Sequence, residues 1–174
     1  DYRFTYAKLL VDNLHPDVIL SHDDWGTKTS LFMQPDTWRE FFKDHYKRIY
    51  GYMKEHDVIV IHHADSFCEP IVEDMVDIGI DIWQGVLPEN DIVKLQKQLD
   101  GRMTLMGGVD ATIDRADATE EEIRANVRKV CETYGPGGHF IPCMTYGLSG
   151  TIYPQTDKYI ADEIDKYNKE TYGI

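Results

Sequence analysis

The stretch covering residues 58–85 constrains the fold of this chain more than any other part of its sequence. Its first four residues are all β-branched, as in a strand that is buried on both faces. The run ends abruptly in His62 and His63, and Asp65 follows two positions later. The pattern predicts a buried parallel strand whose carboxyl end carries imidazole and carboxylate groups.

A helix and a second strand complete this stretch. Ser66 and Glu69 have the spacing of a capping box, so a helix is expected to begin there, and Gly79 is its expected stop. Another strand is predicted to follow at once, over residues 80–85. In α/β sheets and barrels the chemistry lies at the carboxyl ends of such strands, so this unit predicts a site beside His63.

The same strand–helix unit repeats along the chain. Strands are predicted over residues 17–21, 58–61, 80–85, 103–109 and 139–144, and helices over 6–14, 38–53, 66–79, 91–99, 119–134 and 157–172. Thr119 and Glu122 repeat the capping-box spacing. The longest early helix has one apolar face that is expected to be buried, made of Trp38, Phe41, Phe42, Tyr46, Ile49, Tyr50 and Met53.

Alternating strands and helices predict an α/β protein with a parallel sheet. A closed barrel is favoured over an open sheet, because four of the five predicted strand ends carry polar or glycine residues rather than one or two switch-point strands. A (β/α)8 TIM-type barrel needs eight units, so residues 1–174 are expected to be the C-terminal part of such a domain. Alone they would expose unpaired strand edges, which an oligomer or a missing N-terminal half would cover.

Composition excludes several classes of partner. The formal net charge of −13 argues against nucleic acid and anionic membrane surfaces, which require Lys and Arg. No apolar run approaches the ~20 residues that span a bilayer. Three widely spaced cysteines fit a reducing compartment, and without a signal pattern a cytoplasmic location is expected. The chain does not begin with Met, so the gene product is expected to start upstream.

Polar side chains follow the first predicted strand. His22, Asp23 and Asp24 could hold a substrate cation or a metal at the mouth of a pocket, or the acids could simply cap turns. Neighbouring residues of a strand point to opposite sides, so at most one of the two acids faces the pocket. We assign a catalytic role to Asp24 and substrate binding to Asp23 and Trp25.

A second group follows the strand at residues 58–61. His63 and Asp65 are two positions apart, so both can face one side of an extended segment and ligate a metal; alternatively they are a core histidine and a loop cap. We also assign His63 a catalytic role. Cys143 at the last strand end could complete a His/Asp/Cys set with an open fourth position, or be a buried structural cysteine. Cys68 is expected to be a small buried residue.

A third candidate lies after the fourth predicted strand. Gly107 and Gly108 would allow a ligand to approach the backbone, and Asp110 follows them, so we assign substrate binding to Gly108 and Asp110. The alternative is a strand that needs small residues for packing. The sequence contains no dinucleotide-binding glycine motif, P-loop, HExxH or CxxC motif.

Together these segments resemble the uroporphyrinogen decarboxylase superfamily, and within it the corrinoid-dependent methyltransferase-like branch. The matching stretches are DDWGTKTSLFMQPDTWREFFKDHYKRI, HHADSFCEPIVEDMVDIGIDIWQG, LMGGVDA and GGHFIPCMTYG. They span nearly the whole chain but only about the C-terminal half of such a protein. The resemblance implies a (β/α)8 barrel with its cleft at the carboxyl ends of the strands.

The resemblance also implies one of two chemistries. The methyltransferases use zinc, bound by a His-x-Cys motif and a later Cys, to activate a thiol that takes a methyl group from methyl-cobalamin. Here the matching positions are His63, Asp65 in place of the first Cys, and Cys143. The decarboxylases remove acetate carboxyls from a tetrapyrrole without metal, and the position of their late His falls near Thr145.

We therefore expect an enzyme that moves a methyl group to or from a corrinoid protein. The expected cofactor is zinc on His63, Asp65 and Cys143, with a methyl-corrinoid of the partner protein as co-substrate and a small molecule as the other donor or acceptor. A metal-free tetrapyrrole decarboxylase and a non-catalytic partial barrel that binds a partner are the alternatives.

Overall fold

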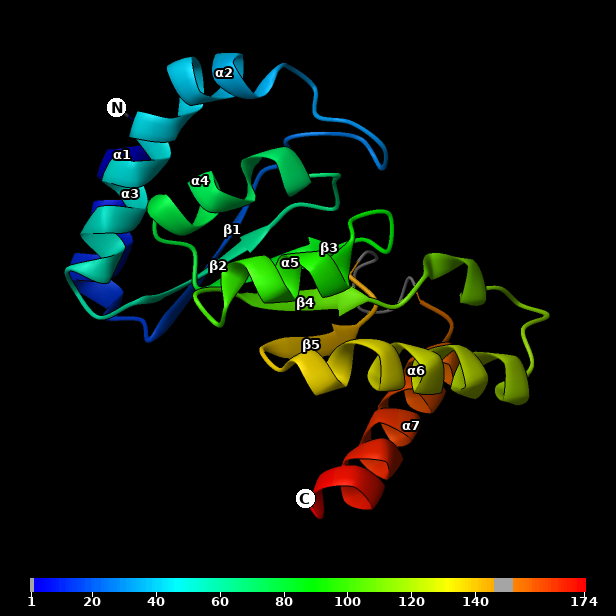
Figure 1. The fold of residues 1–174 in the computed structure, drawn as a ribbon. Helices are drawn as coiled ribbons and strands as arrows, with labels where there is room; N and C mark the ends of the chain where they lie inside the picture. Colours follow the sequence, from blue (N-terminus) through cyan, green and yellow to red (C-terminus); the bar gives the residue numbers. More distant parts are fainter. Residues whose placement is uncertain (1, 146–151) are drawn as a thin grey trace.

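A computed structural model describes residues 2–145 and 152–174 of the chain. At its centre, five parallel strands pair in the order in which they occur in the sequence (Figure 1). The strands are β1 (Val18–His22), β2 (Ile59–His63), β3 (Ile82–Val86), β4 (Thr104–Gly108) and β5 (Phe140–Cys143). All five predicted strands are confirmed, with ends that differ by one or two residues. Sequential parallel order is that of a TIM-type barrel wall, whereas a doubly wound sheet reverses its order at a switch point.

Helices connect the strands, and each predicted helix is present. The α-helices are α1 (Tyr2–Leu14), α2 (Pro35–Trp38), α3 (Asp44–Lys54), α4 (Val72–Asp77), α5 (Ile92–Leu99), α6 (Glu120–Tyr134) and α7 (Pro154–Tyr172). Shorter turns are η1 (Arg39–Lys43), η2 (Glu69–Ile71), η3 (Ala111–Ile113) and η4 (Gly135–Gly137). In Figure 1, α4 and α5 lie across the sheet, and α6 and α7 form a pair beside β5. Over the described ranges, none of these helices is both long and apolar enough to cross a membrane.

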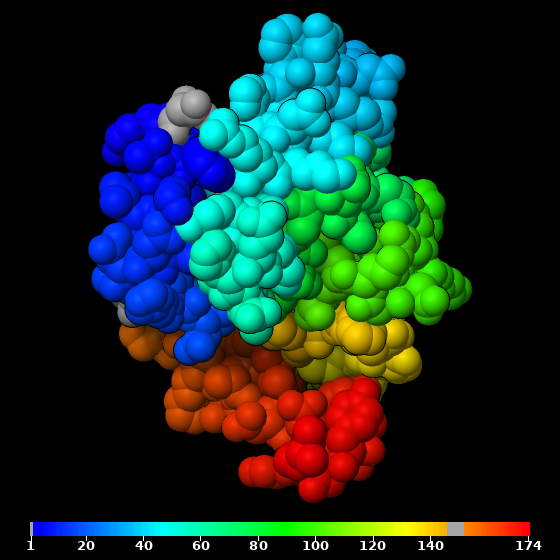
Figure 2. Space-filling view, turned by 90° about the vertical axis from the view of Figure 1, so that its left-hand side faces the viewer, coloured from blue at the N-terminus to red at the C-terminus, as the bar shows by residue number. Residues whose placement is uncertain are grey.

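The two faces of the sheet differ in burial. Side chains on one face, such as Val60, Trp83 and Leu105, are fully buried against the helices. On the other face Leu20 is 57% exposed and Ile141 is 40% exposed. The helices thus cover only the outer face, and the face that would line a barrel lumen is open. In Figure 2 the N-terminal segment is drawn in blue along the left side and the end of α7 in red at the bottom. In the described part of the chain β1 and β5 are the two edges of the sheet, so the wall has not closed on itself.

The predicted capping box at Ser66 and Glu69 is wrong. The chain enters the helix through the 3-10 turn η2, and α4 begins only at Val72. Asn90 takes over the capping from another loop, because its side-chain oxygen accepts the backbone N–H groups of Cys68 at 3.0 Å and Glu69 at 3.2 Å. By contrast, the predicted capping box of Thr119 and Glu122 forms at the start of α6.

The long amphipathic helix contains a π turn, which changes which residues are buried. The hydrogen bonds of η1, a π-helical segment, span one residue more than those of an α-helix, so the apolar face shifts in phase on passing through it. Trp38 and Tyr46 are buried as predicted, but Phe41, within η1, is 59% exposed. The prediction of an apolar face buried throughout is therefore wrong at Phe41.

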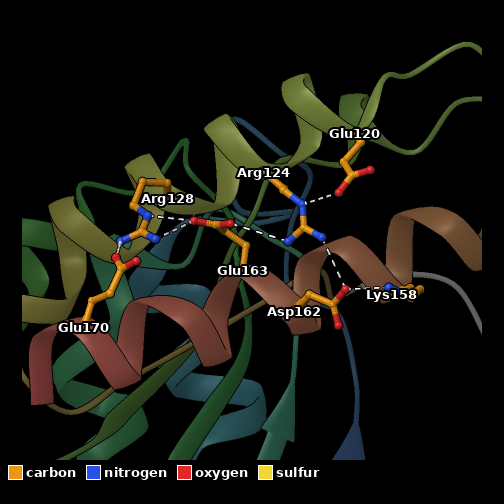
Figure 3. Close-up of polar contacts among 7 residues, drawn as sticks. All are labelled: Glu120, Arg124, Arg128, Lys158, Asp162, Glu163 and Glu170. Carbon is orange, nitrogen blue, oxygen red and sulfur yellow. Dashed lines mark hydrogen bonds and ion pairs between the residues drawn. The ribbon is translucent and has the colours of Figure 1, made fainter. Parts of the chain in front are cut away.

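An ion-pair network fixes the last two helices to each other (Figure 3). Glu163 of α7 is only 3% exposed, and it accepts hydrogen bonds from Arg128 at 2.7 Å and Arg124 at 3.5 Å. Arg124 also donates to Glu120, and Arg128 to Glu170, each at 2.7 Å. The network lies beside a separate small apolar core, so α6 and α7 form a packing unit of their own at the β5 edge.

Candidate functional site

A row of polar side chains lies at the carboxyl ends of the first three strands. His22 on β1 pairs in register with His63 on β2, which pairs with Gln84 on β3. Residues in register on neighbouring strands point to the same side of a sheet, so these three side chains form one layer on the open face. Two residues earlier, the corresponding layer consists of Leu20, Ile61 and Ile82. The polar layer therefore lies on an apolar floor.

His22, Asp24 and His63 form a compact cluster within this layer. The rings of His22 and His63 are 4.4 Å apart between centroids and nearly perpendicular, at 79°. His22 Nε2 lies 3.6 Å from Asp24 Oδ2. One ligand atom from each residue lies within 4.8 Å of the other two, and among the described residues this is the one group of three His, Cys or acidic side chains so placed. Asp24, predicted to be catalytic, therefore lies beside His63 as expected.

Hydrogen bonds orient His63 and the acids beside it. His63 Nδ1 contacts Gln84 Oε1, whose amide nitrogen points to the carbonyl of Thr145 at 3.5 Å. The Gln84 oxygen accepts a proton from Nδ1, which leaves the lone pair of His63 on Nε2. Asp65 Oδ2 lies 3.6 Å from this Nε2, and Asp65 Oδ1 accepts the hydroxyl of Thr145 at 2.7 Å.

The adjacent histidine, His62, points to the opposite, buried face. Its Nε2–H donates to the carbonyl of Asp23 at 3.1 Å, and its Nδ1 accepts the hydroxyl of Tyr50 at 2.7 Å. Burial lowers the pKa of His62 to about 4, because the charged ring would lose its hydration. His62 is therefore a neutral core residue that holds the strand in place.

Two predicted substrate contacts on the loop after β1, Asp23 and Trp25, are engaged by neighbouring helices and aromatic rings. The carboxylate of Asp23 accepts hydrogen bonds from Arg3 at 2.8 Å and from the hydroxyl of Tyr46, so it holds α1 and α3 against the loop. Trp25 is 4% exposed, and its ring stacks on His62 with centroids 4.0 Å apart. Neighbouring aromatic rings enclose Trp25, and its substrate-binding role stays a prediction.

The thiols of Cys143 and Cys68 both lie in buried surroundings that raise their pKa. Burial, with the nearby carboxylate of Asp65 as a smaller effect, raises the pKa of Cys143 to about 12. Cys68 is fully buried, as predicted, and burial raises its pKa to about 12 as well. Of the predicted metal ligands, His63 belongs to the compact cluster and Asp65 lies next to it. Cys143 is the last residue of β5 and is not part of the cluster.

A cavity of about 350 Å³ opens beside the polar layer. Its lining includes Asp65, Thr145, Lys28 and Asp110. Asp110 therefore lies where a substrate contact was predicted, although its carboxylate also accepts the N–H of Thr112 at 2.9 Å.

The packing around Gly108 requires a residue without a side chain. Its φ is +78°, and a Cβ there would lie 2.8 Å from Phe140 Cζ and 3.2 Å from the ring of Tyr134. These contacts favour the packing alternative, and the substrate contact of Gly108 stays a prediction.

Three site residues were missed by sequence reasoning: Gln84, Thr145 and Lys28. Gln84 interrupts an apolar strand two positions after Ile82, and this period of two places it on the same face. That signal could have identified it. Lys28 and Thr145 lie in loops, where no periodicity indicates which way a side chain points.

Comparison with known proteins identifies the family. The model of the uroporphyrinogen decarboxylase (URO-D) family matches residues 5–167. The uroporphyrinogen decarboxylase of Thioalkalivibrio sulfidiphilus is 26% identical over 156 residues, which cover 85% of this chain and 41% of that protein. That of Chlorobium chlorochromatii is 27% identical over 167 residues, covering 87% of this chain and 44% of that protein. The chain thus spans less than half the length of these curated relatives.

Solved structures share the fold at low identity. A methyltransferase from Methanosarcina mazei superposes with a TM-score of 0.71 at 21% identity, over 95% of this chain and 46% of the methyltransferase. A dihydropteroate synthase from Anaplasma phagocytophilum superposes with a TM-score of 0.60 at 16% identity, over 96% of this chain and 66% of the synthase. At such identities the likeness concerns the fold. Because the family model covers nearly the whole chain, the chain belongs to the uroporphyrinogen decarboxylase family.

Proposed function

We propose that the protein containing this chain moves a methyl group to or from a corrinoid protein, with a metal ion assisting the transfer. The observation that carries the proposal is the layer of imidazoles and carboxylates above an apolar floor, at the strand ends where barrel enzymes act. The fold it shares with a methyltransferase supports the same reading.

The residues present suit a divalent ion such as zinc. Zinc binds neutral imidazole nitrogens together with carboxylates, and His63 presents Nε2 for this purpose because Gln84 engages Nδ1. Two ligand sets share His63: one with Asp65 and Cys143, which the family resemblance implies, and one with His22 and Asp24, which the distances favour. A bound divalent ion would lower the pKa of a thiol or water ligand and so supply the nucleophile at neutral pH.

The cavity supplies the positioning groups for the small-molecule substrate. Lys28 offers a cation at the wall, and Asp65 and Asp110 offer carboxylates on the same cavity. Thr145 donates its hydroxyl to Asp65 and so fixes the carboxylate that faces His63. Small-molecule sites in proteins have volumes from roughly 300 Å³ upward. This cavity, of about 350 Å³, would therefore hold a compact methyl donor or acceptor.

A tetrapyrrole decarboxylase is the second candidate, because the curated relatives carry that name. In that case Asp65 and Asp110 would accept hydrogen bonds from pyrrole N–H groups, and no metal would be needed. The polar layer then serves only to bind the substrate.

One pair of assays separates the two candidates. The whole protein is incubated with methyl-cobalamin and a thiol acceptor, and demethylation of the corrinoid is followed by its visible spectrum; the same preparation is assayed with uroporphyrinogen. We expect methyl transfer that chelation abolishes and added zinc restores, and loss of transfer in His63→Ala. His45→Ala, which removes an exposed histidine of α3, is the matched control. Decarboxylation that survives chelation, without methyl transfer, would refute the proposal.

A further inference from the structure

We propose that His22, Asp24 and His63 form the divalent metal site of this chain. The site would lie between β1 and β2, and Cys143 would take no part in it. This inference deepens the proposed function and rests on it for the chemistry that the metal serves. The metal-binding question itself can be answered without any methyl donor.

The strand register brings the two imidazoles together. His22 and His63 are partners across the β1–β2 pair, and Asp24 follows His22 by two residues. Two ligands of one zinc ion, bound at ~2 Å, lie about 3 to 3.4 Å apart in tetrahedral or octahedral geometry. The 3.6 Å between His22 Nε2 and Asp24 Oδ2 exceeds this by only a few tenths of an ångström. The ligand atom of His63 lies within 4.8 Å of the other two, so side-chain rotations that draw the three residues together would complete the coordination.

Two of the three proposed ligands, His63 and Asp24, are each already held by a hydrogen-bond partner outside the cluster. Gln84 engages Nδ1 of His63, and the backbone N–H of Asp65 donates to Asp24 Oδ1 at 2.9 Å. In metal sites such contacts fix the ring or carboxylate so that its remaining donor atom points at the ion. Here Asp24 Oδ2 is the remaining oxygen and lies 3.6 Å from His22 Nε2, while His63 supplies the third ligand atom of the cluster.

The alternative set with Cys143 is less well placed. His63 lies on β2 and Cys143 at the end of β5, and among the described residues Cys143 is not in a group of three ligand atoms within 4.8 Å of one another. The carboxylate of Asp65 already accepts the hydroxyl of Thr145. Asp65 and Thr145 line the cavity, so they are available to the substrate while the metal is held on the β1 side.

Two imidazoles and one carboxylate define the class of ion. This donor set is found in catalytic zinc sites and in non-haem iron sites, where three protein ligands leave positions open for substrate. Imidazole ligands favour a transition ion over Mg²⁺ or Ca²⁺, which prefer oxygen. These three ligands include no thiolate, whereas the ligands implied by the family resemblance include Cys143.

Titration with Co²⁺ tests this assignment, because a thiolate ligand gives cobalt an intense charge-transfer band that nitrogen and oxygen ligands do not. We expect wild-type protein to bind one equivalent with weak d–d bands and no thiolate band. His22→Ala and Asp24→Asn should each weaken binding by more than about a hundredfold, above the effect of losing an orienting partner. Cys143→Ser and the control His45→Ala should bind within about twofold of wild type.

The outcomes separate cleanly. A thiolate band that Cys143→Ser abolishes, wild-type affinity in His22→Ala, or no Co²⁺ binding by wild type would each overturn the inference. The side chain of His22 is 63% exposed, so its removal should leave the fold intact, and circular dichroism verifies this. Binding through His22 and Asp24 in a protein without methyl transfer would leave the site standing and remove the proposed function. Methyl transfer by a protein whose metal is bound by a thiolate would support the proposed function and overturn the metal site inferred here.

Discussion

At the scale of single residues, Gly85 shows how one position shapes the site. The pairing of β3 with β4 slips by one residue between Gln84 and Val86, so Gly85 lies at a bulge, with φ of +110°. A Cβ on Gly85 would lie 2.5 Å from the carbonyl oxygen of Ala64 and 2.8 Å from Asp65 Oδ1. The glycine therefore lets the loop after β2 close over β3, and this closure places Asp65 beside His63.

Gly85→Ala is expected to lower the free energy of unfolding by about 3 kcal/mol, since it combines a backbone clash with a φ that L-residues avoid. Urea unfolding followed by tryptophan fluorescence measures the loss. The control is Gly138→Ala, where φ is +69° and nothing lies within 4 Å of the added carbon. An equal loss in both variants would mean that the clash with Ala64 has no effect.

Sequence reasoning succeeded at residues whose environment follows the strand period. His63 and Asp65 lie on the same side of the chain, as their spacing of two predicts, and their side chains are in contact. His62, one position away from His63, points to the opposite face and is buried between the sheet and the helices. It failed where the partner is distant in sequence. The residues around Trp25 in the sequence do not indicate that His62 stacks on its ring. Likewise, the residues around Gly108 do not indicate that Phe140 packs against it.

At the scale of elements, one carboxylate fastens α4 to the helix before β2. Asp74 of α4 is buried, and it accepts hydrogen bonds from Arg39 at 2.9 Å and Lys43 at 2.7 Å. Burial alone would raise the pKa of Asp74, but these two bonds outweigh it and lower the pKa below its ordinary value of 3.8. The π turn holds both cations, because Arg39 and Lys43 are its first and last residues.

Asp74→Asn is expected to lower the unfolding free energy by about 2 kcal/mol at pH 7, because hydrogen bonds to charged groups are the stronger ones. A depressed folded-state pKa stabilises the fold above the ordinary pKa of 3.8, and this contribution disappears as the pH falls through the folded-state value. The difference between wild type and variant should therefore persist from pH 7 to about pH 4 and shrink below it. Urea unfolding at each pH measures it, and a difference that stays constant down to pH 3 would contradict the assignment.

The pair α6 and α7 depends on the buried member of its ion-pair network. Glu163→Ala would leave Arg124 and Arg128 without their shared partner, so we expect a loss of about 3 kcal/mol. Glu170→Ala removes a carboxylate whose side chain is 51% exposed and that also pairs with Arg128, and should cost less than about 1 kcal/mol. Thermal unfolding of both variants compares them, and similar losses would show that burial of Glu163 adds nothing (Figure 3).

At the scale of the whole molecule, the uncovered sheet face is the main departure from a closed domain. Leu20, Ile59 and Ile141 are 40 to 57% exposed on it, and β1 and β5 are the edges of the sheet in the described part of the chain. Exposed apolar surface with free strand edges promotes association. The order of the strands followed from the sequence, but which face stays open depends on what packs where, and that required coordinates.

We expect this chain by itself to bind a hydrophobic dye and to associate with increasing concentration. Leu20→Glu should reduce both, because it places a charge on the open face. Leu9→Glu on α1 is the matched control, since Leu9 is also 57% exposed but lies away from the sheet. Sedimentation velocity and dye fluorescence provide the measurements, and equal effects of the two variants would rule out a special role for the sheet face.

The π turn at Arg39–Lys43 has a further consequence for chain length. Losing a single residue there would restore ordinary helical winding and rotate everything before it by about 100°. Trp38 would swing away from Trp25, whose ring now lies 4.9 Å from it between centroids. At this point of the chain the number of amino acids matters more than their identity, so deletions should be tolerated far less well than replacements.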